Sequence, residues 1–268
     1  MLKADYHVHS SCSSDAENTM LEMALAGKKA GLDLVCFTDH CDTERFDTGE
    51  FDPDCYNREE MLRQFAEASG CGIELRLGVE IGEALHRSET AASIAADKAL
   101  DFVISSVHAI RGEIDFYCLD YSSRERCEDL LRRYVEEHEQ LVEQTDSFDV
   151  IGHIGYPLRY MYKNGFTELS LLPYAERLAG VFRRIAYKGK GIEINSSGLR
   201  KEGRQAMPSL PLLKLYRECG GEIITVGSDA HRVSDIGSGV NECFELLREA
   251  GFKYYTVFRA RKPEFIKL

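Results

Sequence analysis

The sequence lacks several features that define common protein classes. No stretch approaches the ~18 consecutive apolar residues of a membrane span, and residues 1–20 hold no apolar run suited to a secretory signal. We therefore expect a protein of the cytoplasm with no membrane partner. The nine cysteines are odd in number and include no Cys-x-x-Cys pair, which argues against a disulfide framework and a cysteine zinc site. No linker, repeat or low-complexity tract interrupts the chain, so we predict a single domain over residues 1–268.

Positive charge is also scarce. The formal net charge is −12, whereas the hydrophobic content of 44% and the charged content of 29% are ordinary for a globular protein. A chain with this negative charge lacks the broad positively charged surface of a protein that binds double-stranded nucleic acid, so no nucleic-acid partner is expected. If the substrate is an anion, local positive charge must come from bound metals or from a few arginines. The oligomeric state is left open.

Apolar, strand-like runs alternate along the chain with amphipathic helical segments. Residues 34–37 and 223–226 are nearly continuous in apolar side chains, as is typical of strands buried on both faces of a parallel sheet. The candidate strands lie at 4–8, 33–38, 74–80, 101–107, 149–152, 191–195, 222–227 and 254–258. The alternation indicates an α/β fold. Seven or eight such units fit a barrel better than an open sheet, although periodicity alone does not decide closure.

Helices are expected in the gaps between the strands. Thr19 and Glu22 form a capping box that opens a helix ending at Gly31. Further amphipathic helices are expected at 124–146, 169–187 and 240–250. The longest irregular stretch, residues 41–57, predicts a loop beside the residues at the end of the second strand.

Six of the eight histidines fall at or just beyond the ends of predicted strands: His7, His9, His40, His108, His153 and His231. In α/β barrels this end of the strands builds the active site, so the six imidazoles should converge. His86 and His138 do not follow strands, and we interpret them as hydrogen-bonded structural residues. Strand alternation places His7 and His9 on one face, where two imidazoles are costly to bury unless something uses them.

Carboxylates accompany the histidines. Glu80 ends the third strand, Asp229 precedes His231 by two residues, and Asp15 lies in the loop after the first strand. Six histidines and three carboxylates make nine ligands, enough for two or three ions with a bridging carboxylate. Mixed imidazole and carboxylate ligands favour Zn, Mn or Fe over Ca or Mg. Closely spaced metals of this kind assist phosphoryl displacement.

Segments spread along nearly the whole chain carry a family resemblance. They are YHVHSSCSSDA (6–16), FTDHCD (37–42), GVEIG (78–82), SSVHAI (105–110), IGHIGYPLRY (151–160), IEINSSGLRK (192–201) and GSDAHR (227–232). Together they resemble the polymerase and histidinol phosphatase (PHP) family. Arg159 and the NSSGLRK segment bring the chain nearest to the histidinol-phosphate phosphatases within it.

The resemblance implies a distorted (β/α)7 barrel that holds three divalent ions. The implied ligands are His7, His9, Glu80 and Asp229 for the first ion; Glu80, His108 and His153 for the second; and Asp15, His40 and His231 for the third. Some family members have a histidine where this chain has Asp15, which puts the occupancy and identity of the third ion in question. The candidate strand at 254–258 exceeds the family's seven and is expected outside the barrel.

The implied activity is hydrolysis of L-histidinol phosphate to L-histidinol and phosphate in histidine biosynthesis. We hypothesise that a hydroxide bridging two ions attacks phosphorus. Arg159 and Arg200 offer planar forks for the phosphate. Asp229 or His231 would supply the leaving group's proton, and Glu193 or Asp42 would pair with the substrate's amine.

Three other functions remain open from the sequence. The first is a PHP phosphoesterase acting on a nucleotide or another small phosphate ester; the charge of −12 disfavours long polynucleotides. The second is an amidohydrolase-type barrel, which usually needs a bridging lysine at a strand end, whereas this chain has Glu80 in the bridging position. The third is a metal-binding domain without enzymatic activity, although such domains usually lose ligands and this chain keeps the full set.

Overall fold

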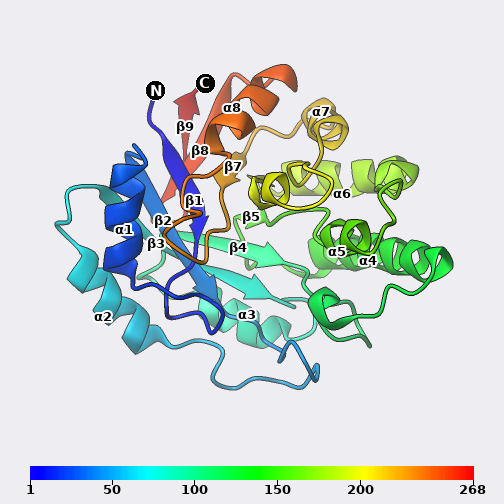
Figure 1. Ribbon diagram of the computed structural model, residues 1–268, viewed down its shortest axis with the longest axis horizontal. Coiled ribbons are helices and arrows are strands. Elements are labelled where there is room, and N and C mark those ends of the chain that lie inside the picture. The colour runs from blue at the N-terminus through cyan, green and yellow to red at the C-terminus, as the bar shows by residue number, and fades with distance from the viewer.

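Seven parallel strands form one sheet in the order of the sequence. The computed structural model describes residues 1–268, and Figure 1 shows the strands with helices packed around them. The strands are β1 (Ala4–Val8), β2 (Leu34–His40), β3 (Glu74–Gly82), β4 (Phe102–Ser106), β5 (Val150–Ile151), β6 (Gly191–Asn195) and β7 (Ile224–Gly227). Each strand pairs in parallel with the next, so all carboxyl ends lie at the same edge of the sheet.

The first and last strands meet and nearly close the sheet into a barrel. Val8 forms a parallel bridge with Ala230. The backbone N–H of His9 donates to the carbonyl of Ala230 at 2.9 Å, and that of Asp229 donates to the carbonyl of His7 at 2.8 Å. The predicted distorted (β/α)7 barrel is therefore confirmed, and its seam lies among residues predicted to bind metal.

The helices follow the expected alternation. They are α1 (Met20–Lys29), α2 (Arg58–Ala68), α3 (Ser88–Ala95), α4 (Arg124–Gln144), α5 (Leu158–Lys163), α6 (Ala175–Tyr187), α7 (Leu210–Glu218) and α8 (Val240–Glu249). The capping box predicted at Thr19 and Glu22 is present at the start of α1. The helix expected over 169–187 begins later, at Ala175, after a short 3-10 turn over Leu172–Tyr174. Pro173 explains this start, because proline suits the first turn of a helix and not its interior.

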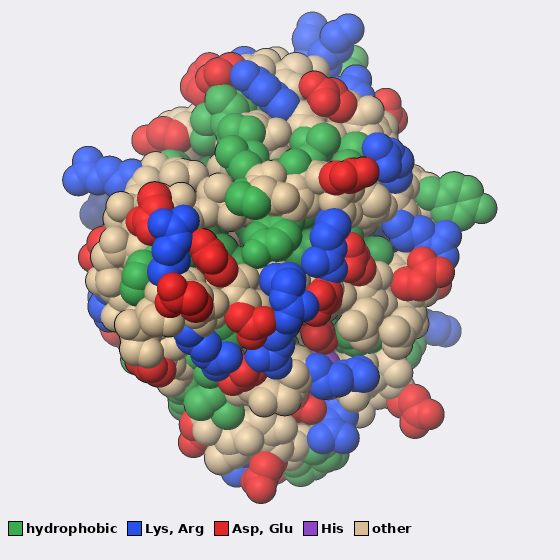
Figure 2. All heavy atoms as spheres, turned by 90° about the vertical axis from the view of Figure 1, so that its right-hand side faces the viewer, with side chains coloured by type: hydrophobic (Ala, Val, Ile, Leu, Met, Phe, Trp, Pro, Cys, Tyr) green, Lys and Arg blue, Asp and Glu red, His purple; other side chains and the backbone are tan.

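A single apolar cluster of 67 buried residues fills the space inside and around the sheet. On the outer surface, charged side chains of both signs intermingle with apolar patches across the face in Figure 2. None of the helices combines the length and the apolar character needed to cross a membrane.

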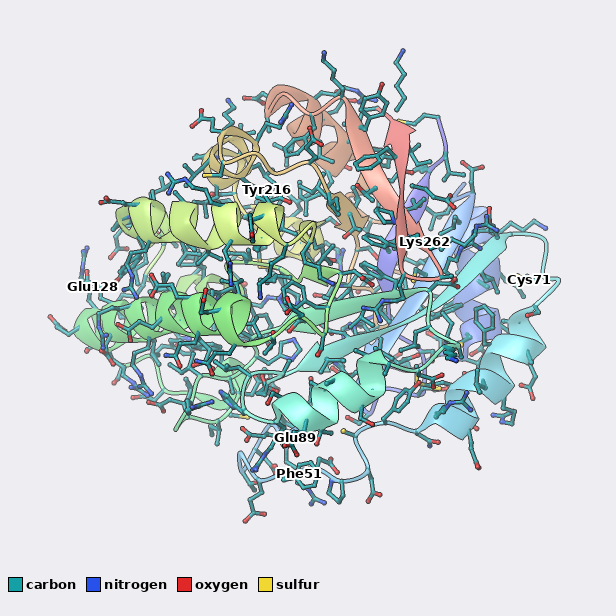
Figure 3. The ribbon with its side chains drawn as sticks, turned by 180° about the vertical axis from the view of Figure 1, so that it is seen from behind. Phe51, Cys71, Glu89, Glu128, Tyr216 and Lys262 are labelled. Carbon is teal, nitrogen blue, oxygen red and sulfur yellow. The ribbon has the colours of Figure 1, made fainter.

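The eighth candidate strand lies outside the barrel, as the resemblance implied. It forms β8 (Tyr254–Arg259), which pairs antiparallel with β9 (Lys262–Lys267) in a terminal hairpin (Figures 1 and 3). Tyr6 of β1 fixes the hairpin, because its hydroxyl donates to the carbonyl of Phe258 at 2.7 Å and accepts from the same residue's N–H at 2.8 Å. The sequence analysis missed β9 because its side chains are mostly exposed and carry no apolar periodicity.

The close spacing of the central strands makes a prediction about Gly78 in β3. A Cβ added there would lie 2.8 Å from the carbonyl oxygen of Phe102 and 3.1 Å from Thr38 Cγ2. We expect Gly78→Ala to destabilise the protein by about 1–3 kcal/mol, because neighbouring backbone must shift. Chemical denaturation followed by circular dichroism measures the change. Gly180→Ala is the control: this exposed helical position has nothing within 4 Å, and we expect it to stabilise by about 0.5–1 kcal/mol. Equal effects of the two variants would contradict the packing argument.

Candidate metal centre

The carboxyl ends of the strands bring all nine predicted ligands together. His7 lies in β1, His40 ends β2 and Glu80 lies in β3, so regular strand geometry aims these three. The others follow their strands by a few residues in short loops: His9 and Asp15 after β1, His108 after β4, His153 after β5, and Asp229 and His231 after β7. His153 and Asp229 adopt left-handed backbone conformations, with φ of 20° and 56°. Such strain in non-glycine residues is typical of functional sites.

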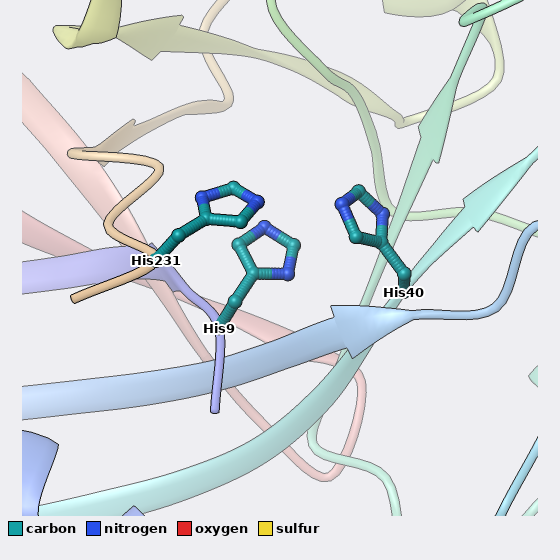
Figure 4. Close-up of side chains that lie close together, drawn as sticks. All are labelled: His9, His40 and His231. Carbon is teal, nitrogen blue, oxygen red and sulfur yellow. The ribbon is translucent and has the colours of Figure 1, made fainter. Parts of the chain in front are cut away.

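Three imidazoles from three different segments face one another at the mouth of the barrel. Figure 4 shows His9, His40 and His231 pointing toward a common space. The ring of His9 lies 4.3 Å from that of His40 and 4.1 Å from that of His231, measured between centroids. Asp15 completes this group, because its Oδ2 lies 3.7 Å from His40 Nε2 and 3.2 Å from His231 Nε2.

Glu80 occupies the centre of the cluster, and its side chain is fully buried. Its Oε2 lies 3.0 Å from His40 Nδ1, 3.2 Å from His7 Nε2 and 3.5 Å from His9 Nε2. Its Oε1 lies 2.8 Å from His153 Nε2 and 3.3 Å from His108 Nε2. Each oxygen thus faces a different set of imidazoles, so Glu80 would contribute one oxygen to each of two ions if both were bound.

The donor atoms in this cluster fit bound metal ions. Nε2 of His7, Nε2 of His9, Nδ1 of His40 and Oε2 of Glu80 are buried and have no hydrogen-bond partner. Polar atoms buried without partners are costly, and several of them aimed at one space are explained by a ligand that they share. Overlapping groups of three ligands form around this space: His9, His40 and His231; His7, His9 and Asp229; His7, Glu80 and His153; and His40, Glu80 and His108. Imidazole with carboxylate suits transition metals such as zinc.

In the metal-free cluster Glu80 and His9 take the forms that bind metal, whereas neighbouring carboxylates raise the pKa values of His7, His40 and His108 against the effect of burial, so these three imidazoles would release protons when a cation binds. Burial alone would raise the pKa of Glu80, but His7, His108 and His40 outweigh burial and hold that pKa well below its usual value. Burial, reinforced by His231 and His40, lowers the pKa of His9 to about 3. Glu80 is therefore a carboxylate and His9 a neutral imidazole at neutral pH, and these are the forms that coordinate cations.

Two carboxylates behind the cluster orient its imidazoles. Glu193 Oε1 lies 2.7 Å from His7 Nδ1, and Asp42 Oδ1 lies 3.1 Å from His108 Nδ1. A carboxylate on the far nitrogen fixes the tautomer and directs Nε2 at a metal. Glu193 was expected at the substrate's amine, but it is 1% exposed. Its Oε2 already accepts from the backbone N–H of His153 at 2.9 Å and from Asn195 at 3.1 Å, so the structure favours the orienting role.

The serines that support the cluster were not predicted from the sequence. Ser106 Oγ donates to Glu80 Oε1 at 2.6 Å, and Ser13 Oγ lies 3.2 Å from His9 Nδ1. Ser13 also donates to the buried Asp39 at 2.8 Å. The available signal was the pair Ser105–Ser106 at the end of an otherwise apolar strand, where a polar residue has to find a partner inside the barrel.

The two predicted phosphate-binding arginines take different positions. Arg159 Nη2 donates to Ser197 Oγ at 2.6 Å and lies 3.4 Å from Asp229 Oδ2, so this guanidinium borders the cluster. Its Nε is buried without a partner. Arg200 donates to the carbonyls of Ser228 at 2.8 Å and Ser238 at 3.4 Å. Arg159 therefore keeps donor capacity beside the ligands, whereas Arg200 braces the backbone next to Asp229.

Known proteins resemble this chain in sequence and in fold. The model of the PHP domain matches residues 5–197. A histidinol-phosphatase from Lactococcus lactis is 29% identical over 269 residues, covering 98% of this chain and 96% of the relative. A probable histidinol-phosphatase from Thermotoga maritima is 27% identical over 258 residues, covering 94% of each. The crystal structure of histidinol phosphate phosphatase from Lactococcus lactis, complexed with zinc, L-histidinol and phosphate, superposes with a TM-score of 0.81. It is 26% identical and covers 98% of this chain and 99% of that one.

The central place of Glu80 makes a prediction about metal content. Because Glu80 faces five imidazoles, Glu80→Ala should remove more metal per protein than His231→Ala, which changes one group at the rim. Elemental analysis after dialysis measures the content. His138→Gln is the control, because His138 lies on α4 and its Nδ1 contacts only the carbonyl of Tyr134 at 2.8 Å. A wild-type protein without transition metal, or a Glu80→Ala protein with wild-type content, would refute the assignment.

Proposed function

The chain belongs to the PHP family, and from that premise we propose that it is a metal-dependent phosphatase that hydrolyses L-histidinol phosphate to L-histidinol and phosphate. The observation that carries the proposal is the juxtaposition of a buried, ligand-rich cluster around Glu80 with the guanidinium of Arg159, 3.4 Å from Asp229. Similarity over 98% of the chain to a histidinol-phosphatase supports the choice of substrate.

We assign three ions to the cluster. The proposed ligands are His7, His9, Glu80 and Asp229 for the first, Glu80, His108 and His153 for the second, and Asp15, His40 and His231 for the third. Zinc is the favoured metal, since the similar Lactococcus lactis structure contains it, and Mn or Fe would also suit these ligands. When bound, the ions would supply an activated water and neutralise charge on the phosphoryl oxygens.

The residues of this chain then hold the substrate in place. Arg159 is proposed to contact the phosphate with its fork of N–H donors. The ring of Tyr156 lies against this guanidinium, with Cζ 4.8 Å from the ring centroid, and limits its motion. Arg200 is proposed to support the phosphate site indirectly, because its guanidinium donates to the carbonyl of Ser228, the residue before Asp229.

Polar groups are also proposed for the other end of the substrate. Asp42 is 27% exposed, in contrast to the buried Glu193, and it remains the candidate partner for the amine of histidinol. Asp229 and His231 are the candidate donors of the leaving group's proton. His231 is the more accessible of the two, with 25% of its side chain exposed against 8% for Asp229. A role in histidine biosynthesis in the cytoplasm belongs to the same proposal.

Substrate comparison tests the activity itself. We expect kcat/KM for histidinol phosphate to exceed that for AMP and for p-nitrophenyl phosphate by at least about 100-fold, since a site that pairs with the amine discriminates against esters that lack it. Phosphate release measures all three. Chelation should abolish the activity, and added zinc or manganese should restore it. Full activity after verified metal removal would disprove the metal mechanism. A higher kcat/KM for AMP would contradict histidinol phosphate as the substrate and indicate a nucleotide instead.

Arg159 provides a second test. We expect Arg159→Ala to lower kcat/KM for histidinol phosphate by about 10²–10³-fold, because the loss removes donors aimed at the phosphate. Arg159→Lys should restore only part of the loss, since an ammonium cannot make the paired contact. Arg177→Ala on the surface of α6, where the arginine pairs with Glu139, is the control and should keep wild-type kinetics. Unchanged kinetics in Arg159→Ala would contradict the proposed role of Arg159 in phosphate binding.

A further inference from the structure

His86 lies outside the metal cluster and makes two close contacts with carboxylates. It follows β3 and precedes α3. Its Nδ1 lies 2.8 Å from Glu44 Oε2, and its Nε2 lies 2.9 Å from Glu137 Oε1. The three side chains are largely buried, with exposed fractions of 6% for His86, 15% for Glu44 and 7% for Glu137. Both ring nitrogens of this imidazole thus face a carboxylate oxygen.

This geometry requires a charged imidazole. A neutral imidazole has a single N–H and would leave one nitrogen lone pair facing a carboxylate, whereas an imidazolium donates from both nitrogens. Burial lowers the pKa of His86, but the hydrogen bonds that its imidazole donates to Glu137 and Glu44 outweigh burial and raise the pKa above the usual value. The geometry and the raised pKa both favour the imidazolium, and its two hydrogen bonds to the carboxylates are then charge-assisted.

The bridge joins two parts of the chain that are far apart in sequence. Glu137 lies on α4, which packs on the outside of the barrel, and Glu44 lies in the irregular loop 41–57. The same loop leans on the segment that precedes α3, because the guanidinium of Arg87 lies 5.4 Å from the ring centroid of Phe51. Figure 3 shows Phe51 beneath α3, which carries Glu89.

The loop also reaches the metal cluster. Asp42, two residues before Glu44, accepts from His108 Nδ1 at 3.1 Å. Between them, Thr43 Oγ1 donates to the carbonyls of Gly82 at 3.2 Å and Glu83 at 3.1 Å. Glu44 is thus joined by two peptide units to the carboxylate that orients a predicted metal ligand, and Thr43 between them ties this part of the loop to the end of β3.

We propose that His86 is a positioning residue, whose bridge between Glu44 and Glu137 holds the loop 41–57 against α4 and thereby keeps Asp42 on His108. The effect on the loop stands by itself, and only the consequence for catalysis rests on the proposed function. The bridge is closed while His86 is protonated, and it loosens when His86 loses its proton.

Few other charges face this bridge. Arg87 Nε lies 3.3 Å from Glu44 Oε1, and the backbone N–H of Arg111 lies 3.4 Å from Glu137 Oε2. The guanidinium of Arg111 donates to the carbonyl of Leu85, and Glu113 nearby pairs with Arg126 and Arg133. Because the pKa of His86 is raised by folding, the stabilisation is fully present below the usual histidine pKa of about 6.5 and is lost as the pH rises through the raised value.

Amide hydrogen exchange of residues 43–52 tests the bridge. We expect His86→Ala to accelerate exchange of these amides by roughly tenfold to a hundredfold, because both charge-assisted bonds are lost. The apparent affinity for zinc, measured by competition with a chelator, should fall by roughly tenfold as Asp42 leaves His108. Arg132→Gln is the matched control: it removes an exposed ion pair with Glu136 on α4, does not touch the loop, and should leave zinc affinity at the wild-type value.

The double variant Glu44→Gln with Glu137→Gln tests the proton. A neutral His86 can donate to one amide oxygen and accept from the other amide nitrogen, so the loop should stay protected. Its protection should also stop falling as the pH rises above the usual histidine pKa of about 6.5, the change that loosens the wild-type loop. Unchanged exchange in His86→Ala, zinc affinity that does not fall with the loosened loop, or a persistent pH dependence in the double variant would each overturn the proposal. These readouts use no phosphate ester, so they hold or fail independently of the substrate.

Discussion

A buried negative charge at the centre of the barrel mouth constrains everything around it. Glu80 has no exposed surface, and an ionised carboxylate in such a place is tolerated only with nearby positive partners. Five imidazoles lie within 3.5 Å of its two oxygens. Burial, reinforced by repulsion from His231 and His40, lowers the pKa of His9, whereas Glu193, Glu80 and Asp229 raise that of His7 against the effect of burial. Divalent cations satisfy both the carboxylate and the neutral imidazoles, so the cluster is best understood as built for metal.

The second layer of the site follows from the same constraint. An imidazole that must present one nitrogen to a cation needs its other nitrogen held by an acceptor, and Glu193 and Asp42 do this for His7 and His108. Arg159 then balances Asp229 on the open side. Burying so many polar groups at one end of the barrel is unfavourable. The burial of apolar side chains in the cluster of 67 residues and the pairing of the hairpin β8–β9 compensate for this elsewhere in the fold.

The strand ends could be predicted from the sequence because they combine two independent signals. Apolar runs predicted the bounds of β1 and β6 as observed, and the histidines at or just beyond the ends of β1 and other strands predicted where the candidate ligands gather. Elements without an apolar run were missed, such as β9 and the short helix α5. The hydrogen-bond partner of a buried polar residue could not be predicted either. Glu193 and His7 are 186 positions apart, and sequence periodicity does not indicate that their side chains are in contact. An expected substrate contact thus became a buried orienting group.

His86 and His138 show why such pairings decide function. Both histidines fall outside the strand ends, and sequence spacing gives them the same interpretation. In the fold His138 contacts one backbone carbonyl, that of Tyr134 on its own helix, and burial lowers its pKa to about 4. It is a neutral core residue. His86 meets carboxylates from two distant segments and holds a proton between them. The two histidines thus differ in how many carboxylates they contact: none for His138, and two for the histidine that couples a loop to the metal centre. This difference can be found only in the tertiary structure.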